Sequence, residues 1–445
     1  MSWDFCTEPE FQQKLDWADR FVTDEVEPLD LAFPDEHFDI PTAALRSVID
    51  PLKQRVKAEA LWAAHLEPDL GGQGYGQVRL ALLNEILGRS SWAPLIFGTQ
   101  APDTGNAEIL AKYGTDEQKA EYLAPLLEGE IFSCFSMTEP HAGSDPKLFT
   151  TRAVRDGDHW VINGEKFFSS NAHVAAFFIV MAVTDPDVSP YEGMSMILVP
   201  AGTPGITMRR NVATMYDRPG EGHHGWLRYD NVRVSEANVL GGEGKAFVVA
   251  QTRLGGGRIH HAMRTVAVCK QAFDMMCQRA ATRHTQGSLL GEKQLVQAAI
   301  ADSWMQINQL RLLVLHTAWL IDKCTAEGDL SGRRVRKEIA ACKVQASRVM
   351  HDVVYRALHT HGALGVSQDT RLARMWQRAP SMGIVDGPTE VHQVTIARQL
   401  LRQYAPYEGV WPPYWLPPRI EEARARYADV LAAHEAEKAE TAASR

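Results

Sequence analysis

The sequence predicts an α+β protein with an N-terminal α-helical domain, a middle β-barrel or sheet domain and a C-terminal α-helical bundle. Two observations support this fold class: apolar residues recur at helical spacing in both end regions, and the central region instead shows short apolar runs separated by tight turns. With 445 residues, 45% of them hydrophobic, the chain can bury a sizeable core in two or three domains. We expect these domains at 1–130, 131–240 and 241–405, followed by a tail at 406–445.

The helical prediction for the two end regions rests on apolar residues three or four positions apart, which share one face of a helix. In the first region they are Phe11, Leu15, Ala18 and Val22. In the last region they are Ile307, Leu310, Val314, Ala318 and Ile321. Such a stripe is typical of the core of a helical bundle. The glycine-containing segments 327–332 and 361–365 are expected to separate the long helices of the last region.

The central region carries the signals of paired strands. Residues 150–155 and 160–162 flank an Asp-Gly-Asp turn, which is typical of a β-hairpin. The apolar runs 176–183 and 194–199 predict two more strands. Beyond the bundle, the Pro-rich segment 411–418 predicts an extended arm that precedes a terminal helix.

The composition argues against several classes of protein. The formal charge is −9 and no basic stripe is present, so a nucleic-acid partner is not expected. The six cysteines form no Cys-x-x-Cys pair, which argues against a metal site and a disulfide framework and fits reduced thiols in the cytoplasm. The first residues lack the basic and apolar parts of a signal peptide, and no apolar run reaches the roughly 18 residues of a membrane span.

The most informative segment is 135–145, with the sequence Phe-Ser-Met-Thr-Glu-Pro-His-Ala-Gly-Ser-Asp. Thr138 and Ser144 offer hydroxyl groups, Gly143 allows close approach to the backbone, and Pro140 fixes the turn between them. This composition suits a strand that ends against a polar, planar ligand. A Gly-Ser-Asp loop taken alone is more typical of a simple strand-ending turn.

The order Met-Thr-Glu-Pro-x-Ala-Gly-Ser-Asp resembles the flavin-binding signature of the acyl-CoA dehydrogenases. The resemblance covers roughly residues 10–405 and implies the same plan of helices, strands and helices, with FAD as the cofactor. It also implies that Ser144 contacts both the substrate and the cofactor. The cofactor-binding residues that it implies in this segment are Phe135, Met137, Thr138, Gly143 and Ser144.

Two further segments resemble the flavin site of the same family. Residues 166–171 are similar to its Lys-x-Trp-x-Thr-Asn segment, which implies that Phe168 and Ser170 border the flavin ring. Without the resemblance, two phenylalanines in a strand would more often be core residues. Residues 283–290 are similar to the pattern Arg-x-x-Phe-Gly-x-x-Leu, which implies that Arg283 reaches the FAD pyrophosphate of a neighbouring subunit.

The remaining cofactor contacts implied by the resemblance lie in the last region. Residues 359–365 occupy the place of a Gln-x-x-Gly-Gly-x-Gly turn near the diphosphate, although His359 and Ala363 depart from that pattern. The residues of this group are Gln294, His359, Gly362, Ala363, Pro388 and Glu390.

Asp386 is the predicted catalytic residue. It lies where many members of the family have the Glu that removes the α-proton of the acyl thioester while the flavin accepts the β-hydride. An Asp at a Gly-Pro turn is otherwise typical of a helix N-cap. Some relatives carry their base immediately before the residue equivalent to Arg258, but Gly257 stands there in this chain. Arg258 is expected to position the substrate, or else to be an ordinary buried ion-pair partner.

The resemblance implies that the product is the trans-2-enoyl-CoA, that an electron-transferring flavoprotein accepts the electrons, and that the chain forms a homodimer or homotetramer. Residues 254–261 and 386–392 are most similar to the branch of family members 10 and 11, some of which process 4-hydroxyacyl-CoA in its 4-phospho form. Three alternatives therefore remain: a 4-phospho- or 4-hydroxyacyl-CoA substrate, oxidation of a non-thioester substrate, and a flavin-binding subunit without turnover.

Overall fold

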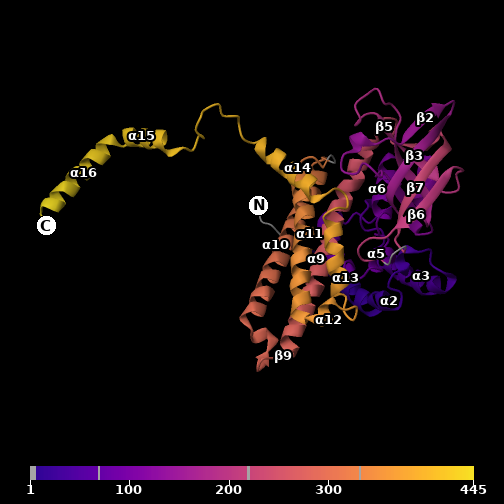
Figure 1. The fold of residues 1–445 in the computed structure, drawn as a ribbon, viewed down its shortest axis with the longest axis horizontal. Coiled ribbons are helices and arrows are strands. Elements are labelled where there is room, and N and C mark those ends of the chain that lie inside the picture. The colour runs from indigo at the N-terminus through magenta and orange to yellow at the C-terminus, as the bar shows by residue number, and fades with distance from the viewer. Residues whose placement is uncertain (1–6, 69–70, 218–220, 330–331, 445) are drawn as a thin grey trace. The chain divides into compact units, whose positions relative to one another are not determined.

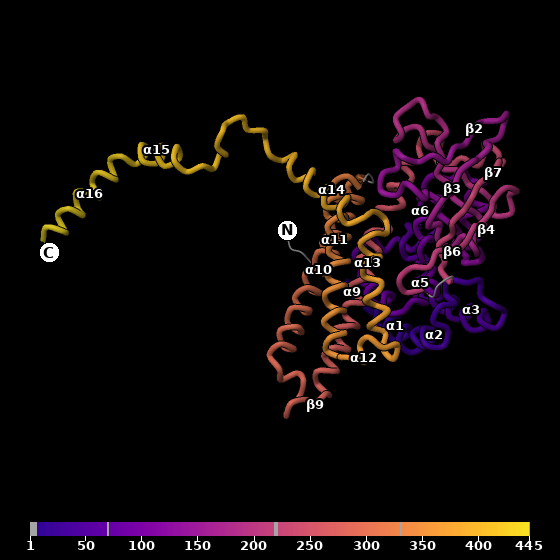
Figure 2. Tube along the Cα trace, viewed as in Figure 1, coloured from indigo at the N-terminus to yellow at the C-terminus, as the bar shows by residue number. Residues whose placement is uncertain are grey.

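The computed structural model describes residues 7–68, 71–217, 221–329 and 332–444, and their contacts divide the chain into two compact units at 1–396 and 397–445. Figures 1 and 2 show helices, a sheet and then long helices in chain order within the first unit. This order confirms the predicted fold class.

The N-terminal part is helical because its apolar stripes pack on one another. Thr42 caps the third helix through its hydroxyl, and Thr115 and Gln118 form a capping box on a shorter one. The helices are α1 (Pro9–Phe21), α2 (Glu27–Ala32), α3 (Ala43–Ala58), α4 (Gly76–Leu87), α5 (Ala93–Ile96), α6 (Asp103–Tyr113), α7 (Asp116–Gln118) and α8 (Ala124–Glu128). Four residues of the predicted stripe, Phe11, Leu15, Ala18 and Val22, are buried.

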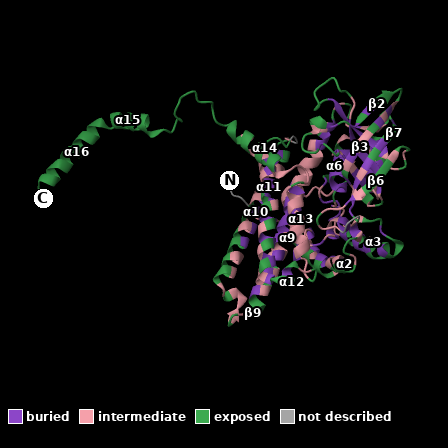
Figure 3. Ribbon diagram, viewed as in Figure 1, coloured by how far each residue is buried: buried purple, intermediate pink, exposed green. Residues whose placement is uncertain are grey.

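The middle part is an eight-stranded sheet with the order β6-β7-β3-β2-β4-β5-β8, and β1 pairs in parallel with β4. The predicted hairpin is formed by β2 and β3, with Gly157 at φ +64° in its turn. Almost every residue of β4 is buried, which explains its unbroken apolar sequence (Figure 3). The strands are β1 (Phe132–Ser136), β2 (Arg152–Asp156), β3 (His159–Ser170), β4 (Ala175–Val183), β5 (Met194–Pro200), β6 (Ile206–Val212), β7 (His224–Ser235) and β8 (Val239–Leu240).

The C-terminal helices form a bundle in which α9 packs closely against α11, α4 and α10. The predicted stripe on α10 faces the core, since Ile307, Leu310, Val314 and Ala318 are buried and Ile321 packs beside them. A short hairpin of β9 (His284–Thr285) and β10 (Ser288–Leu289) follows the first helix. The helices are α9 (Ala246–Thr282), α10 (Gln294–Ala326), α11 (Arg336–His361), α12 (Ala363–Val366), α13 (Leu372–Met382) and α14 (Thr389–Leu401).

The second unit contains the end of α14, α15 (Leu416–Arg426) and α16 (Ala428–Ala443). Pro417 and Pro418 lie in the first turn of α15, where proline is tolerated because the missing N–H would have no helical acceptor. The described residues of 401–444 are exposed. Among all residues that the structure describes, no helix is long and apolar enough to cross a membrane.

A buried ion pair fixes the end of β1 against β3. Lys166 Nζ lies 2.9 Å from Glu139 Oε1 and donates to the Met137 carbonyl at 2.8 Å, and both charged side chains are almost fully enclosed. Burial raises the pKa of Glu139, but Lys166 and the N–H groups of Thr150 and Thr151 outweigh it and leave this pKa below its ordinary value. Burial lowers the pKa of Lys166 to about 8.

This pair leads to a prediction about stability. Lys166→Met leaves the buried Glu139 carboxylate without its cation and should lower the free energy of unfolding by about 3–5 kcal/mol. The control is Arg334→Met, which breaks the exposed Arg334–Glu327 pair and should have a much smaller effect. Urea unfolding followed by circular dichroism measures both variants. Equal losses would show that the buried pair contributes no more than a surface pair.

The same pair predicts a dependence on pH. The unfolded chain protonates Glu139 at a higher pH than the folded chain does, because the folded-state pKa is lowered. The stabilisation is therefore complete above about pH 4.5 and is lost as the pH falls through the folded-state pKa. In Glu139→Gln this part of the acid destabilisation should be absent from urea unfolding curves recorded between about pH 3 and about pH 6. Wild type and Glu139→Gln with the same pH dependence would contradict this account of the pair.

Candidate active site

Three consecutive glycines interrupt the side-chain cover of α9. Each mid-helix glycine costs about 1 kcal/mol relative to alanine, so Gly255, Gly256 and Gly257 weaken this 37-residue helix. Three such residues in a row indicate that the absence of side chains serves another purpose here. A Cβ atom on Gly257 would lie 2.9 Å from Asp386 Oδ2, and one on Gly256 would lie 2.7 Å from Glu108 Oε2. A Cβ on Gly255 would meet no atom within 4 Å. Two of the three glycines thus make room for carboxyl groups.

Asp386 lies in the link between α13 and α14 with a φ of +55°, a left-handed conformation that Asp tolerates better than most residues. Its backbone carbonyl accepts a hydrogen bond from Arg258 Nε at 2.8 Å. Its side chain is 15% exposed, with His261 Nε2 at 3.6 Å from Oδ2 and Arg253 Nη1 at 4.0 Å from Oδ1. Among the described residues, no backbone N–H donates to its carboxylate, so the helix-cap alternative finds no hydrogen bond here.

Three basic side chains surround the Asp386 carboxylate. Arg253, Arg258 and Lys343 all act electrostatically on this carboxylate. Burial lowers the pKa of Lys343 to about 8, so it stays mostly cationic at neutral pH, and its Nζ donates to the Met382 carbonyl. Burial lowers the pKa values of His261 and His392 to about 4, so both rings are neutral. Arg258 and Lys343 therefore face the predicted base, together with Arg253, on which Glu108 and Asp103 also act.

Arg253 connects Asp386 to the signature segment. Its guanidinium lies over the Phe135 ring at 4.1 Å from the centroid, and its Nε donates to Asn106 Oδ1 at 2.8 Å.

Four residues of the site were not predicted from the sequence: Arg253, Glu108, Lys343 and His392. The available signal was the glycine triplet itself, because three glycines inside a helix indicate that other groups approach its backbone.

The ends of β1 and β3 meet as the resemblance implies. Phe167 N donates to the Thr138 carbonyl at 2.8 Å, and Ser170 Oγ lies 2.8 Å from His224 Nδ1. Phe168 has a φ of +53° and is 46% exposed, so the interpretation of this residue as core is wrong.

These strand ends fit FAD. Phe168 is partly exposed beside the rings of Phe167 and His224, the Thr138 hydroxyl has no partner among the described residues, and a Cβ on Gly143 would meet only Thr138 Cγ2 at 3.9 Å. A partly exposed ring, a hydroxyl without a partner among the described residues and an open glycine loop are groups that a flat polar cofactor would cover. Ser144 is exposed on the same loop.

Comparison with known proteins decides the family. Models of the acyl-CoA dehydrogenase N-terminal, middle and C-terminal domains match residues 8–130, 134–232 and 244–401. The chain is 41% identical to FadE2 of Mycobacterium tuberculosis, named as a probable acyl-CoA dehydrogenase, over 89% of this chain and 92% of FadE2. The chain belongs to the acyl-CoA dehydrogenase family.

Other acyl-CoA dehydrogenases support the predicted branch and fold. The chain is 43% identical to acyl-CoA dehydrogenase family member 11 of Gallus gallus over 80% of its own length, but it spans only 45% of that relative. The solved butyryl-CoA dehydrogenase of Megasphaera elsdenii has a TM-score of 0.76 and 27% identity, with 90% of this chain and all of that chain covered. The predicted family is thereby confirmed. Its members are flavin-dependent oxidoreductases that act on acyl-CoA, and all three of its domains are present.

A second group of predicted cofactor residues lies far from Asp386. Figure 1 shows β9 and α12 at one end of the bundle and α14, which follows Asp386, at the other. The exposed residues at the β9 end are Arg283, Gln294, His359, Gly362 and Ala363. Pro388 and the exposed Glu390 lie beside Asp386 at the start of α14. In this chain Arg253 therefore connects Phe135 of the signature segment with Asp386, whereas the group at the β9 end lies apart from them.

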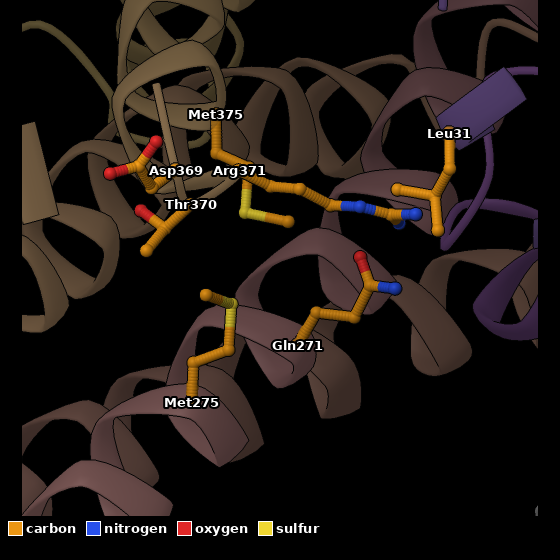
Figure 4. A pocket seen from close by; sticks show the side chains of 7 residues that line it. All are labelled: Leu31, Gln271, Met275, Asp369, Thr370, Arg371 and Met375. Carbon is orange, nitrogen blue, oxygen red and sulfur yellow. The ribbon is translucent and has the colours of Figure 1, made fainter. Parts of the chain in front are cut away.

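A hollow of about 390 Å³ opens between α2, α9 and α13 (Figure 4). Gln271, on its wall, is 14 residues beyond Gly257 on α9, which corresponds to about 21 Å along the helix. None of the predicted site residues lines it. The lining residues are Leu31, Gln271, Met275, Asp369, Thr370, Arg371 and Met375.

The glycine triplet supplies a prediction with a matched control. Gly257→Ala forces the new Cβ against Asp386 Oδ2 and should lower the rate of flavin reduction by acyl-CoA at least tenfold, because a small misplacement of a reacting group is costly. Gly255→Ala adds the same methyl group into open space and should mainly stabilise α9, by about 0.5–1 kcal/mol. Anaerobic rapid mixing and thermal unfolding measure the two effects. If both variants slow reduction equally, contact with Asp386 is not the reason for Gly257.

Proposed function

We propose that this protein is an FAD-dependent acyl-CoA dehydrogenase that converts an acyl-CoA thioester into the trans-2-enoyl-CoA, with Asp386 as the base. The observation that carries the proposal is the Asp386 carboxylate, which reaches the gap at Gly257 without any capping hydrogen bond among the described residues. Arg253 bridges from this carboxylate to Phe135 of the signature segment. α,β-Dehydrogenation requires the base on one side of the α–β bond of the substrate and the flavin on the other side.

The residues around Asp386 serve the removal of the α-proton. Arg258 holds the Asp386 carbonyl and so fixes the left-handed turn that directs the carboxylate toward α9. The N–H of Asp386 has no acceptor among the described residues, and it is the group that would polarise the thioester carbonyl as enolate charge develops. Asp386 then takes the α-proton on a carboxylate oxygen.

The cofactor contacts proposed for one subunit are those of the strand ends, where Phe135, Met137, Thr138, Phe168 and Ser170 lie. Bound FAD supplies the acceptor for the β-hydrogen and its electron pair. We propose that Arg283 and its exposed neighbours contact the FAD of a second subunit, since they lie away from Asp386 in their own. An electron-transferring flavoprotein is the electron acceptor we propose.

Replacement of the base tests the mechanism. Asp386→Asn keeps the shape of the side chain but cannot accept the α-proton at neutral pH, so flavin reduction should fall by roughly two to four orders of magnitude. FAD content and acyl-CoA binding should stay near wild type, and Asp386→Glu should retain part of the rate. Rapid anaerobic mixing with acyl-CoA, followed at the flavin absorbance band, gives the rates. Near-native reduction by Asp386→Asn would place the base on another carboxyl group.

The assembly can be tested separately. Arg283→Ala removes an exposed guanidinium group, which is always charged and carries several N–H donors, so the variant should lose FAD more readily on dilution. Light scattering should show at least a dimer for the FAD-loaded wild type. A fully active, FAD-loaded monomer would exclude the role of Arg283 across a subunit boundary.

A second candidate substrate is favoured by the charge around Asp386. Glu108 and Asp103 also act on Arg253, but Asp386 is the acid that acts on both Arg258 and Lys343, so an acyl chain with an anionic group would find compensation beside these two cations. A 4-phosphoacyl-CoA, or the 4-hydroxyacyl-CoA from which it is made, has such chemistry. Product analysis distinguishes the candidates: release of inorganic phosphate supports the phosphorylated substrate, and simple enoyl-CoA formation supports the unsubstituted one.

A further inference from the structure

The side chain of Asn106 on α6 connects β1 with α9. Its Nδ2 donates to Ser133 Oγ on β1 at 2.8 Å. Its Oδ1 accepts from Arg253 Nε on α9 at 2.8 Å. Asn106 and Ser133 are fully buried, so water does not compete for these bonds. A buried amide with both ends bonded fixes the groups on either side of it.

The direction of these hydrogen bonds is set by Asp103, the first residue of α6. Its Oδ1 accepts from the Ser133 hydroxyl and, at 2.8 Å, from the Ser133 backbone N–H, and its Oδ2 accepts from Gln100 Nε2 at 2.7 Å. Burial raises the pKa of Asp103 to about 6, so the carboxylate, which only accepts, predominates at neutral pH. The Ser133 hydroxyl therefore gives its hydrogen to Asp103 and accepts from the Asn106 amide nitrogen. The Asn106 amide oxygen is thereby left to face Arg253.

Arg253 is consequently anchored through its Nε, while its Nη1 faces Asp386. A Cβ on Gly105 would lie 2.9 Å from Arg253 Cγ, so α6 also packs tightly on the stem of this side chain. The Nη1 atom lies 4.0 Å from Asp386 Oδ1, which is beyond hydrogen-bond distance. At this separation the positive charge favours the ionised carboxylate, yet Arg253 does not occupy the oxygen that must accept the α-proton.

An unanchored guanidinium beside a carboxylate forms a direct ion pair, often with two parallel hydrogen bonds. Such a pair would make Asp386 a weaker base. We propose that Asn106 is a positioning residue, which anchors Arg253 where it keeps Asp386 ionised without bonding to its oxygens. Ser133 and Asp103 fix the orientation of Asn106. This inference rests on the proposed function, because it assumes that Asp386 removes the α-proton.

Asn106→Leu removes the anchor with little change in volume, and Asn84→Leu is its matched control. Asn84 on α4 is also buried and accepts from Arg264 Nε on α9 at 2.9 Å. Arg264 lies 11 residues beyond Arg253, which corresponds to about 16 Å along the helix. In the FAD-loaded protein, Asn106→Leu should slow flavin reduction at saturating acyl-CoA at least tenfold and leave the dissociation constant of acyl-CoA near wild type. Asn84→Leu should keep the wild-type rate, and equal losses in the two variants would overturn the assignment.

A second substitution shows whether Asn106 acts through Arg253. If the released Arg253 is what slows the reaction, Asn106→Leu should have little effect in the Arg253→Met background. The same loss in both backgrounds would show a purely structural role of Asn106 and would overturn the proposal. Ser133→Ala gives a second route if Asn106→Leu does not fold. It removes the acceptor of the Asn106 amide nitrogen and should slow reduction only when Arg253 is present.

Several other charged or titratable groups surround Asp386 and Arg253, and all of them are common to the wild type and to Asn106→Leu. Those of the described residues that face Asp386 are Arg258 and His261 on α9, Lys343 on α11 and His392 on α14. Those that face Arg253 are Asp103 and Glu108 on α6 and Cys134 on β1. A different titration of Asp386 in Asn106→Leu therefore reports the changed position of Arg253.

NMR of protein labelled with carbon-13 at the aspartate carboxyl groups separates this inference from the proposed function. The signal of Asp386 is the one that Asp386→Asn lacks, and its titration needs no turnover. In Asn106→Leu the titration midpoint should fall relative to wild type, because a direct hydrogen bond from Arg253 favours the ionised form. In the Arg253→Met background, Asn106→Leu should leave the midpoint unchanged. If no acyl-CoA reduces the flavin, the proposed function fails, but an unchanged or higher midpoint in Asn106→Leu is the result that would reject the role of Asn106.

Discussion

The site depends on the close approach of two carboxyl groups to the backbone of α9. Glycine allows this approach without any shift, whereas a Cβ at Gly256 or Gly257 would lie less than 3 Å from a carboxyl oxygen and would displace that side chain. The helix gives up roughly 1 kcal/mol of propensity at each position, and the packing of α9 against its neighbours offsets that loss. The same gap brings together α6, the link after α13 and, through Arg253, the strand β1.

A second constraint acts on the flavin side of the site. The enclosed pair of Glu139 and Lys166 ties the signature loop to β3, and Glu139 also accepts hydrogen bonds from Thr150 and Thr151. With these backbone groups fixed, Phe168 is held in a left-handed conformation with its ring exposed. Within the signature, Glu139 therefore has a structural role, whereas the hydroxyl of the neighbouring Thr138 has no partner among the residues that the structure describes.

Most of the fold could be predicted from the sequence because the spacing of hydrophobic residues along the chain distinguishes helices from strands. The stripe on α10 and the runs of β4 and β5 have the predicted types and nearly the predicted bounds. Asp386 was identified only through resemblance to a family. Glu108 and Lys343 were missed because each comes from a different helix, and only tertiary packing brings them to α9. Phe168 was ambiguous for a similar reason, since an apolar residue in a strand does not reveal whether a protein core or a ligand covers it.

The central claim is that the thioester binds with its α-carbon against Asp386. A structure of the Asp386→Asn variant with FAD and an acyl-CoA measures this directly, because the variant should bind both molecules without turnover. The account predicts that the substituted amide side chain lies in contact with the α-carbon, with the flavin on the opposite face of the α–β bond and Phe168 against the ring. An α-carbon in contact with Glu108, or a thioester bound away from the glycine gap of α9, would contradict it.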